Sequence, residues 1–289
     1  MIKLRFFSDY DSSENLLTRF QQNYNVYDKL LDFTVNDDYN YAIIFNRANE
    51  SIRPWAKKIT IIQEPSWSEA HQYVNSLTDT DFLIIHDVAL FEKKYNIKLG
   101  MKVIESPSYM FYHDHLPHSF FADTESIKKT RKISMIVSGQ QFSRGNYRKR
   151  LAVLSEILSS DLDIDIYGRG LHIRDERYKG RLEYKYVGLI PYEYSIAIEN
   201  CNERNYITEK FVDCVICNTT PIYNGAPNIS EVYDPLFFKT IDLDSPDIVD
   251  RIKQIIKEPA PGAGPNKKIY FEQYNLYSKL KEIISADSK

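Results

Sequence analysis

Short apolar, β-prone runs recur along the first third of the chain, separated by polar stretches. Four of them read MIKLRFFS (1–8), YAIIFN (41–46), KITIIQ (58–63) and FLIIHD (82–87). Most of their apolar positions are continuous and do not alternate with polar ones, which is typical of parallel strands covered on both faces. The segment SSENLLTRFQQNY follows the first run and predicts a helix that Ser12 or Ser13 can cap.

A second series of the same kind begins after the polar, basic segment ADTESIKKTRK (122–132). The predicted strands ISMIVSG (133–139), DIDIYG (163–168), YSIAIE (194–199) and TTPIYNG (219–225) alternate with predicted helices near 146–160 and 206–217. This alternation indicates βαβ units and a parallel sheet. Two series joined by one charged linker therefore predict an α/β protein with two Rossmann-like, doubly wound domains.

The predicted domains span residues 1–125 and 126–265, and the break KEPAPGAGP (257–265) precedes a last predicted helix over 266–289. In doubly wound sheets, ligands bind beyond the carboxyl ends of the strands. We therefore expect the two domains to face each other across a ligand-binding cleft.

Composition narrows the class of protein. The chain has 289 residues, with 37 Lys and Arg against 40 Asp and Glu, so its net charge of −3 excludes a chain-wide electrostatic nucleic-acid binder. The first residues lack the apolar run of a signal peptide, and no tract approaches the roughly 20 apolar residues that span a bilayer. These features predict a cytoplasmic protein, soluble or attached peripherally at the inner membrane surface.

Two patterns suggest metal binding at first sight. Cys214 and Cys217 form a C-x-x-C pair, and Asp163 and Asp165 have the D-x-D spacing that some transferases use for a metal. No second cysteine pair completes a zinc site, and the aspartates fall within a predicted strand. With Cys201 the cysteines number three, which favours free thiols in a reducing compartment. We expect no metal ligand from the protein.

The stretch IAIENCNERNYITEKFVDC (196–214) carries the most chemistry. It runs from a predicted strand through a polar break into a helix start, where unpaired backbone N–H groups and the helix dipole favour phosphate. Lys210 adds a full positive charge, Glu209 can accept hydrogen bonds from ribose hydroxyls, and Tyr206 offers a ring and a hydroxyl. The alternative is an ordinary capped helix whose Glu209 and Lys210 are only solvated.

This stretch and its continuation also resemble the donor-binding signature of a known family. Glu199-Asn200, the motif YITEK (206–210) and the tract PIYNGAP (221–227) resemble the α1,3/α1,4-fucosyltransferases of glycosyltransferase family 10, in their bacterial type. Upstream, Arg144 and Leu151 keep the spacing of the family's strand-to-helix segment, although Gly139 stands where the family has Asn. DIDIYGRG resembles a further strand of the family. The resemblance covers roughly residues 130–245.

The resemblance implies a GT-B fold and inverting transfer of L-fucose from GDP-fucose to a glycan hydroxyl. It implies no obligatory cofactor; a divalent metal would stimulate at most, without protein ligands. The implied donor-binding residues are Arg144, Glu199, Asn200, Tyr206, Glu209 and Lys210. Partners would be the nucleotide sugar and a glycan acceptor in protein glycosylation or lipopolysaccharide biosynthesis.

The family uses a carboxylate as catalytic base at the end of an N-terminal strand. Glu64, in KITIIQEPS, is the favoured counterpart, because the strand-like run 82–87 follows it as the family's next strand should. Glu105, in VIESPSY, is the alternative. Two other functions stay open: transfer of a different GDP-deoxysugar, and non-catalytic binding of a nucleotide sugar.

The last predicted helix carries an apolar-aromatic stripe at helical spacing, formed by Tyr270, Tyr274, Tyr277, Leu280 and Ile284. Residues 266–289 also contain five lysines against three acids. Such a helix would either pack onto the N-terminal domain or dock on an anionic membrane surface.

Overall fold

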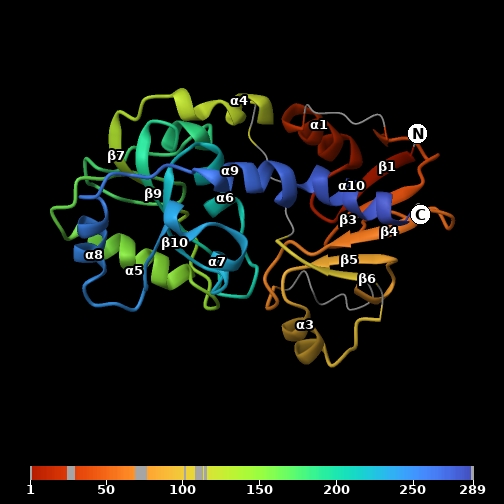
Figure 1. Ribbon diagram of the computed structural model, residues 1–289. Coiled ribbons are helices and arrows are strands. Elements are labelled where there is room, and N and C mark those ends of the chain that lie inside the picture. The colour runs from red at the N-terminus through yellow and green to blue at the C-terminus, as the bar shows by residue number, and fades with distance from the viewer. Residues whose placement is uncertain are drawn as a thin grey trace. The chain divides into compact units, whose positions relative to one another are not determined.

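The computed structural model describes residues 2–24, 30–68, 77–100, 102–107, 113 and 116–287. The chain forms two compact units (Figure 1). Unit 1 comprises residues 1–118 together with 272–289, and unit 2 comprises residues 119–271. Each unit contains one sheet whose described strand pairs are all parallel, so the expected α/β class is confirmed.

The sheet of unit 1 has the strand order β2-β1-β3-β4-β5-β6. Its strands are β1 (Ile2–Ser8), β2 (Leu31–Phe33), β3 (Tyr41–Phe45), β4 (Lys57–Ile61), β5 (Phe82–Ile85) and β6 (Lys102–Glu105). All four predicted runs form strands. The pattern missed β2 and β6, because β2 is only three residues long and β6 is an edge strand with no fully buried residue.

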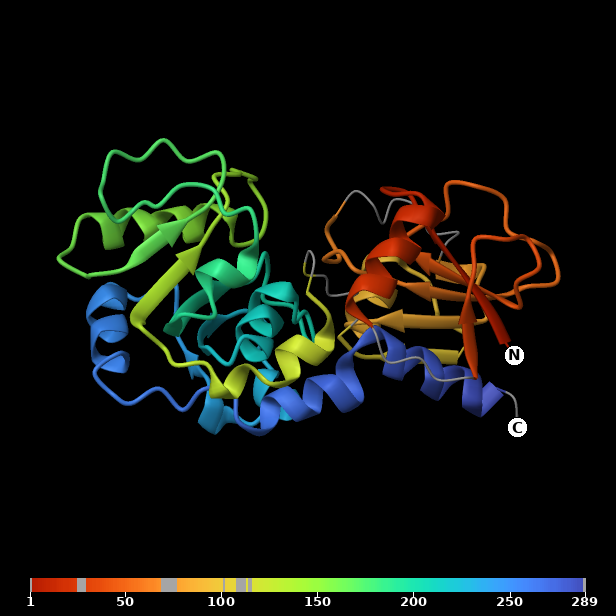
Figure 2. The same cartoon turned by 90° about the horizontal axis from the view of Figure 1, so that it is seen from above.

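The helices of unit 1 are α1 (Ser13–Asn23), α3 (Val88–Tyr95) and α10 (Leu276–Asp287). The Ser12 hydroxyl caps α1 by accepting from the Asn15 backbone N–H at 3.2 Å, as predicted. Figure 2 shows α1 in red and α10 in dark blue beside the orange strands. Both helices bury apolar side chains, among them Phe20 and Leu280, in one core with Phe6 of β1.

The sheet of unit 2 has the order β11-β10-β9-β7-β8. Its strands are β7 (Arg131–Ile136), β8 (Asp165–Tyr167), β9 (Tyr192–Ile198), β10 (Thr220–Asn224) and β11 (Lys239–Thr240). Helices α5 (Tyr147–Leu158) and α8 (Ile248–Ile255) share a core with these strands and lie near each other in Figure 1. Helix α6 (Glu209–Ile216) lies between β9 and β10 in the chain order and contacts both.

The shorter helical segments complete unit 2 and its borders. They are α4 (His118–Ala122), η2 (Thr124–Ser126), η3 (Lys185–Gly188), α7 (Ile229–Val232), η4 (Pro235–Phe237), α9 (Pro265–Ile269) and a π-helical turn η5 (Tyr270–Tyr274).

Both units wind in the same way. In unit 1 the chain passes from β1 to β2 on one side and then crosses to β3 on the other side of β1. In unit 2 it passes from β7 to β8 and then crosses to β9. The strand order therefore reverses between β1 and β3 and between β7 and β9. In open parallel sheets such reversal points are where ligands bind, beyond the carboxyl ends of the strands.

The predicted linker is packed rather than extended. Phe121 is fully buried, and the buried Thr124 hydroxyl donates to the carbonyl of Ile216 at 2.7 Å. Lys267, which is 3 % exposed, donates to the same hydroxyl at 2.8 Å. Residues 119–125 consequently belong to unit 2, whereas the predicted first domain extended to residue 125.

The predicted last helix is divided into two helices. The chain forms α9, then the π-helical turn η5, and then α10 after Asn275. Tyr270 is fully buried, and Leu276, Leu280, Ile283 and Ile284 lie in the core of unit 1. The Asp287 carboxylate accepts from the Tyr41 hydroxyl at 2.6 Å. The stripe is therefore used for packing and is not free to enter a lipid surface. Within the described ranges, no helix is both long enough and apolar enough to cross a bilayer.

We expect Ile284→Val to lower the free energy of unfolding by about 1 kcal/mol, because it removes one buried methyl group from this core. Urea denaturation measures the loss, with Ala286→Ser on the exposed side of α10 as the matched control. The intact protein should not bind anionic liposomes at low salt. Two results together would contradict the packed position of α10: the intact protein and Ile284→Val both bind liposomes, and Ile284→Val is as stable as the wild type.

Candidate functional site

A cavity of about 370 Å³ opens at the reversal point of the unit 2 sheet. Its walls come from the ends of β7 and β8, from β9, from the segment 181–189, from α5 and from the first turns of α6. The charged lining residues are Arg150, Arg169, Arg181, Lys185 and Lys210 against Glu209 and Asp213. Five cations against two acids give the cavity a positive balance, which suits an anionic ligand.

Glycines bring two loops together at the rim of this cavity. A side chain at Gly139 would place its Cβ 2.0 Å from the carbonyl oxygen of Gly170, and one at Gly168 would lie 1.7 Å from the carbonyl of Val137. Only glycine fits such close backbone approaches. A larger residue at Gly139 or Gly168 would therefore clash with the facing loop.

Helix α6 begins at Glu209, three residues later than the predicted start at 206. Thr208 is the N-cap, and its hydroxyl accepts from the Lys210 N–H at 3.3 Å, so Tyr206 precedes the helix. The loop before it is fixed by Asn205, which adopts a left-handed conformation with φ 54°. Asn205 and Asn228 exchange two hydrogen bonds of 2.8 Å. Asn tolerates this conformation better than most residues, so the sequence suits the bend.

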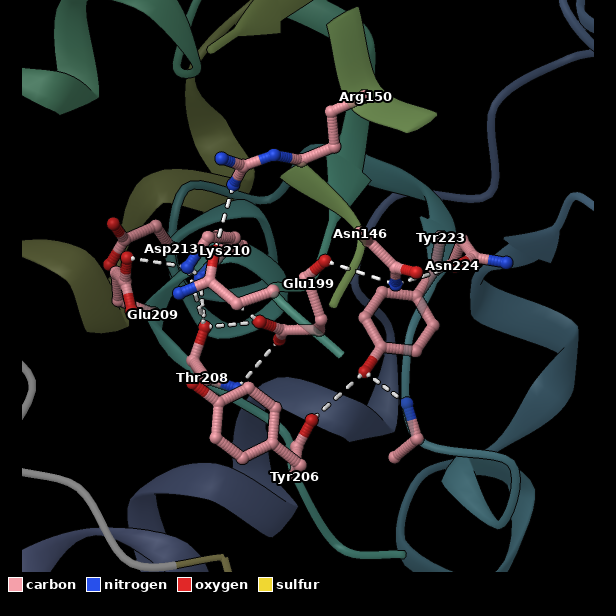
Figure 3. Close-up of polar contacts among 12 residues, drawn as sticks. Asn146, Arg150, Glu199, Tyr206, Thr208, Glu209, Lys210, Asp213, Tyr223 and Asn224 are labelled. Carbon is pink, nitrogen blue, oxygen red and sulfur yellow. Dashed lines mark hydrogen bonds and ion pairs between the residues drawn. The ribbon is translucent and has the colours of Figure 1, made fainter. Parts of the chain in front are cut away.

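The Glu199 carboxylate lies beside Thr208 and supports this cap (Figure 3). It is fully buried, and its carboxylate accepts from the Thr208 N–H at 2.7 Å and from the Thr208 hydroxyl at 2.5 Å. The Lys210 ammonium lies 3.7 Å away. Burial raises the pKa of Glu199 to about 7, although Lys210 and the Thr208 donors oppose the shift. Glu199 is not among the cavity-lining residues, so it positions the helix start and does not face a ligand.

Lys210 and Glu209 form the cavity side of this cluster. The Lys210 ammonium donates to Glu209 at 3.0 Å and to the Thr208 hydroxyl at 3.2 Å, and its side chain is 22 % exposed. Desolvation disfavours the charge on Lys210, but Glu209 and Glu199 outweigh it and raise the pKa. Desolvation likewise opposes ionisation of Glu209, and Lys210 with Lys185 still holds its pKa below the usual range. Both groups are therefore charged at neutral pH.

Arg150 is the site residue that the sequence reasoning missed. It is 5 % exposed, lies 4.6 Å over the ring of Tyr147, and donates to the Asn200 side-chain oxygen at 2.9 Å. Its Nε has no hydrogen-bond partner in the described part of the chain. A buried donor without a partner is rare in proteins and is consistent with a ligand contact. The sequence contained a signal for this burial, because Arg150 lies at helical spacing from Tyr147, Leu154 and Ile157, which are other buried residues of α5.

The structure brings five of the six predicted donor-binding residues together and leaves one apart. Glu209 and Lys210 line the cavity, Glu199 supports the cap and Asn200 holds Arg150. Tyr206 is buried, and its backbone carbonyl accepts from the Tyr223 hydroxyl at 3.5 Å. Arg144 is exposed and does not line the cavity.

The two candidate bases both follow strands of unit 1, but in different surroundings. Glu64 follows β4 in a turn whose Ser66 carbonyl accepts from Lys94 and, at 3.1 Å, from the Tyr95 hydroxyl. The neighbouring Gln63 side chain accepts from the Tyr10 hydroxyl at 3.1 Å, and Tyr10 follows β1 at the reversal point.

Glu105 ends the outermost strand, β6, on the far side of β5 from Glu64. Its carboxylate accepts from the Val88 backbone N–H at 3.3 Å, so it helps to cap α3. Of the two carboxylates, Glu64 follows the strand nearer the reversal point, and Glu105 contacts a helix end.

The cysteine and aspartate patterns have structural roles. Cys201, Cys214 and Cys217 are buried free thiols. Asp165 accepts from the Tyr192 hydroxyl at 2.6 Å and pairs with Arg131. Among the residues that the structure describes, no three His, Cys, Asp or Glu side chains gather as a metal site would require.

We expect Glu199→Gln to change the pH dependence of stability. The folded pKa of Glu199 is raised from 4.5 to about 7, so its stabilising contribution is present below the unfolded pKa and is lost as the pH rises through about 7. The amide of the variant cannot ionise, so between pH 5 and pH 8 the wild type should lose on the order of 2 kcal/mol relative to the variant. Urea unfolding across this range measures the difference, and parallel curves would contradict the buried, proton-binding carboxyl.

The segment around the cavity matches a known protein family. Residues 126–259 match the model of glycosyltransferase family 10 (fucosyltransferase), C-terminal part. A putative fucosyltransferase-like protein of Arabidopsis thaliana is 33 % identical over 115 residues, which are 38 % of this chain and 21 % of that protein. GDP-fucose protein O-fucosyltransferase 3 of Gallus gallus is 29 % identical over 174 residues, covering 50 % of this chain and 36 % of that protein.

The fold comparison extends over most of the chain. The crystal structure of an α1,3-fucosyltransferase superposes with a TM-score of 0.52 at 17 % identity, covering 89 % of this chain and 77 % of that one. This likeness shows the GT-B fold. The chain spans only about a fifth to a third of the two curated relatives, so their whole-protein activities are not transferred with the match. The segment 126–259, which carries the cavity, therefore matches glycosyltransferase family 10, the fucosyltransferases.

Proposed function

We propose that this protein transfers L-fucose from GDP-fucose to a hydroxyl group of a glycan acceptor, with inversion at the anomeric carbon. The observation that carries the proposal is the cationic cavity at the reversal point of the family 10 segment, with Lys210 and the buried Arg150 in its wall. A relative named for its GDP-fucose donor matches half of the chain, which supports the same donor here.

Lys210, Arg150 and the start of α6 would bind the diphosphate. Each supplies N–H donors or positive charge, and Arg150 has an unpartnered Nε to offer. Glu209 would accept hydrogen bonds from the ribose hydroxyls, since its ionised carboxylate is an acceptor only. As the bond between fucose and phosphate breaks, negative charge grows on GDP, and the same cations stabilise it in the transition state.

A sugar hydroxyl is a weak nucleophile and needs a base. In the proposed step Glu64 takes the proton while the acceptor oxygen attacks the anomeric carbon of fucose from the face opposite GDP. One carbon–oxygen bond forms, the bond to the β-phosphate breaks, and GDP leaves with the bonding electrons. Attack from the opposite face inverts the anomeric configuration. No step requires a cofactor or a metal bound by the protein.

The test is an assay of GDP release and product formation with GDP-fucose and a panel of glycan acceptors, including glycopeptides and lipopolysaccharide fragments. We expect turnover with GDP-fucose, an inverted linkage by NMR, and activity that survives chelation of divalent metals. Turnover with another GDP-deoxysugar alone would change the donor. GDP binding with neither transfer nor donor hydrolysis would show a binding protein instead of an enzyme.

A further inference from the structure

The cavity of unit 2 has two chemically different ends. Strand β9 runs toward the carboxyl edge of the sheet, and α6 runs back from that edge because β10, which follows it, is parallel to β9. Lys210, in the first turn of α6, therefore lies at the outer end of the cavity, and Asp213 and Ser195 lie further in. The proposed diphosphate site occupies the outer end.

The inner end is mainly apolar and contains one ion pair. Leu182 and Leu189 line the cavity with Lys185 and Asp213. The Lys185 ammonium and the Asp213 carboxylate are 2.9 Å apart, and Asp213 is only 3 % exposed. Lys185 comes from η3 and Asp213 from the second turn of α6, so the pair joins two walls of the cavity. Neither residue has a place in the proposed catalytic step.

A flat apolar slot with one cation beside one carboxylate matches the edge of a purine that presents an acceptor beside donors. Guanine presents its O6 acceptor next to the N1–H and N2–H₂ donors, whereas adenine presents an N6–H₂ donor next to the N1 acceptor. An ammonium suits O6, and a carboxylate, which accepts about four hydrogen bonds, suits N1–H and N2–H₂ even while it is paired with a lysine.

We propose that Lys185 and Asp213 read the base of the donor nucleotide and select guanine, with Asp213 facing N1–H and N2–H₂ and Lys185 facing O6. This inference rests on the proposed function, because it assigns the base end of the same donor site. It adds two specificity-determining residues that no motif singled out. The pair also predicts that the 2-amino group, and not the phosphates, distinguishes guanine from other bases here.

The experiment compares GDP, IDP and ADP by titration calorimetry at one salt concentration. IDP lacks only the 2-amino group of GDP, so the ratio of the two affinities isolates the contact with Asp213. We expect the wild type to prefer GDP over IDP by about 10-fold or more, the scale of a hydrogen bond to a charged group, and to bind ADP more weakly still.

Two variants separate the two contacts. Asp213→Asn should bring the GDP-to-IDP affinity ratio close to 1. Lys185→Met should weaken GDP and IDP alike, by about 10-fold, and leave their ratio unchanged, because both bases carry O6. Glu193→Gln is the control, since Glu193 pairs with Lys132 away from this cavity and should alter neither affinity. Thermal melts establish that each variant is folded.

Each outcome decides something. A GDP-to-IDP ratio that survives Asp213→Asn, or a GDP affinity unchanged by Lys185→Met, overturns the inference and leaves the proposed function standing. If Asp213→Asn fails to fold, the exposed Lys185 still provides the test. A wild type that binds GDP and IDP equally also removes the base-reading role. A wild type that binds no GDP would end both this inference and the proposed function.

Discussion

Glu64→Gln should lower turnover by about 10²-fold or more while the protein still binds GDP. The substitution keeps the shape of the side chain but removes the proton acceptor, so the acceptor hydroxyl would lose its base. The turn that holds Glu64 should keep its position, since Ser66 is anchored through its backbone carbonyl to Tyr95 and Lys94. Steady-state rates with GDP-fucose, together with GDP titration, separate lost chemistry from lost binding.

The matched control is Glu105→Gln, which tests the other carboxylate that resembles the family motif. The amide oxygen of Gln can still accept from the Val88 N–H, so α3 should keep this capping contact. We expect turnover close to that of the wild type. The assignment of the base is wrong if Glu105→Gln is the impaired variant and Glu64→Gln remains active.

Lys210→Ala should weaken GDP binding by on the order of 1–3 kcal/mol, the scale of a charge-assisted hydrogen bond. It removes a cation from the wall of the cavity. It also leaves Glu199 and Glu209 without their nearest positive charge, since Lys210 lies 3.7 Å from Glu199 and 3.0 Å from Glu209. Titration calorimetry measures the affinity, and a thermal melt shows whether the cluster tolerates the change. An unchanged GDP affinity would remove Lys210 from the donor site.

Two arginines give a further comparison at the same site. Arg150 is buried in the cavity wall, whereas Arg144 is exposed and outside it. We expect Arg150→Met to reduce GDP affinity by about 10-fold or more, because it removes a buried charge-assisted donor. Arg144→Met should have the smaller effect. A larger loss of GDP affinity in Arg144→Met than in Arg150→Met would support Arg144 as the donor-binding arginine, as the motif spacing suggested.

The predicted strands could be recognised because their physical cause is local. Ile59 and Ile61 of β4, like Ile84 and Ile85 of β5, are buried as the continuous apolar pattern implies. Strand β11 covers only two residues, and no apolar run in the sequence predicts its pairing with β10. Elements of this length are stabilised by their neighbours, so pattern reasoning does not detect them.

The donor-site motif shows the same division between local and tertiary causes. Thr208, Glu209 and Lys210 are adjacent in the chain, and a helix start brings them together without help from other segments. The motif identified Glu199 as a site residue. Its role depends on tertiary burial, because the buried carboxyl accepts from Thr208 and does not contact a ligand.

By itself, the sequence determined that this is a two-domain α/β protein, that its C-terminal half carries the family 10 signature, and that Glu209 and Lys210 stand at a helix start. Those features depend on periodicity and on residues close together in the chain. Only the tertiary structure decided that Arg150 and not Arg144 enters the cavity wall, and that the predicted linker is packed against unit 2. It also paired Lys185 with Asp213, 28 residues apart. These outcomes depend on which distant backbones approach each other, and only the packed sheet and helices determine that.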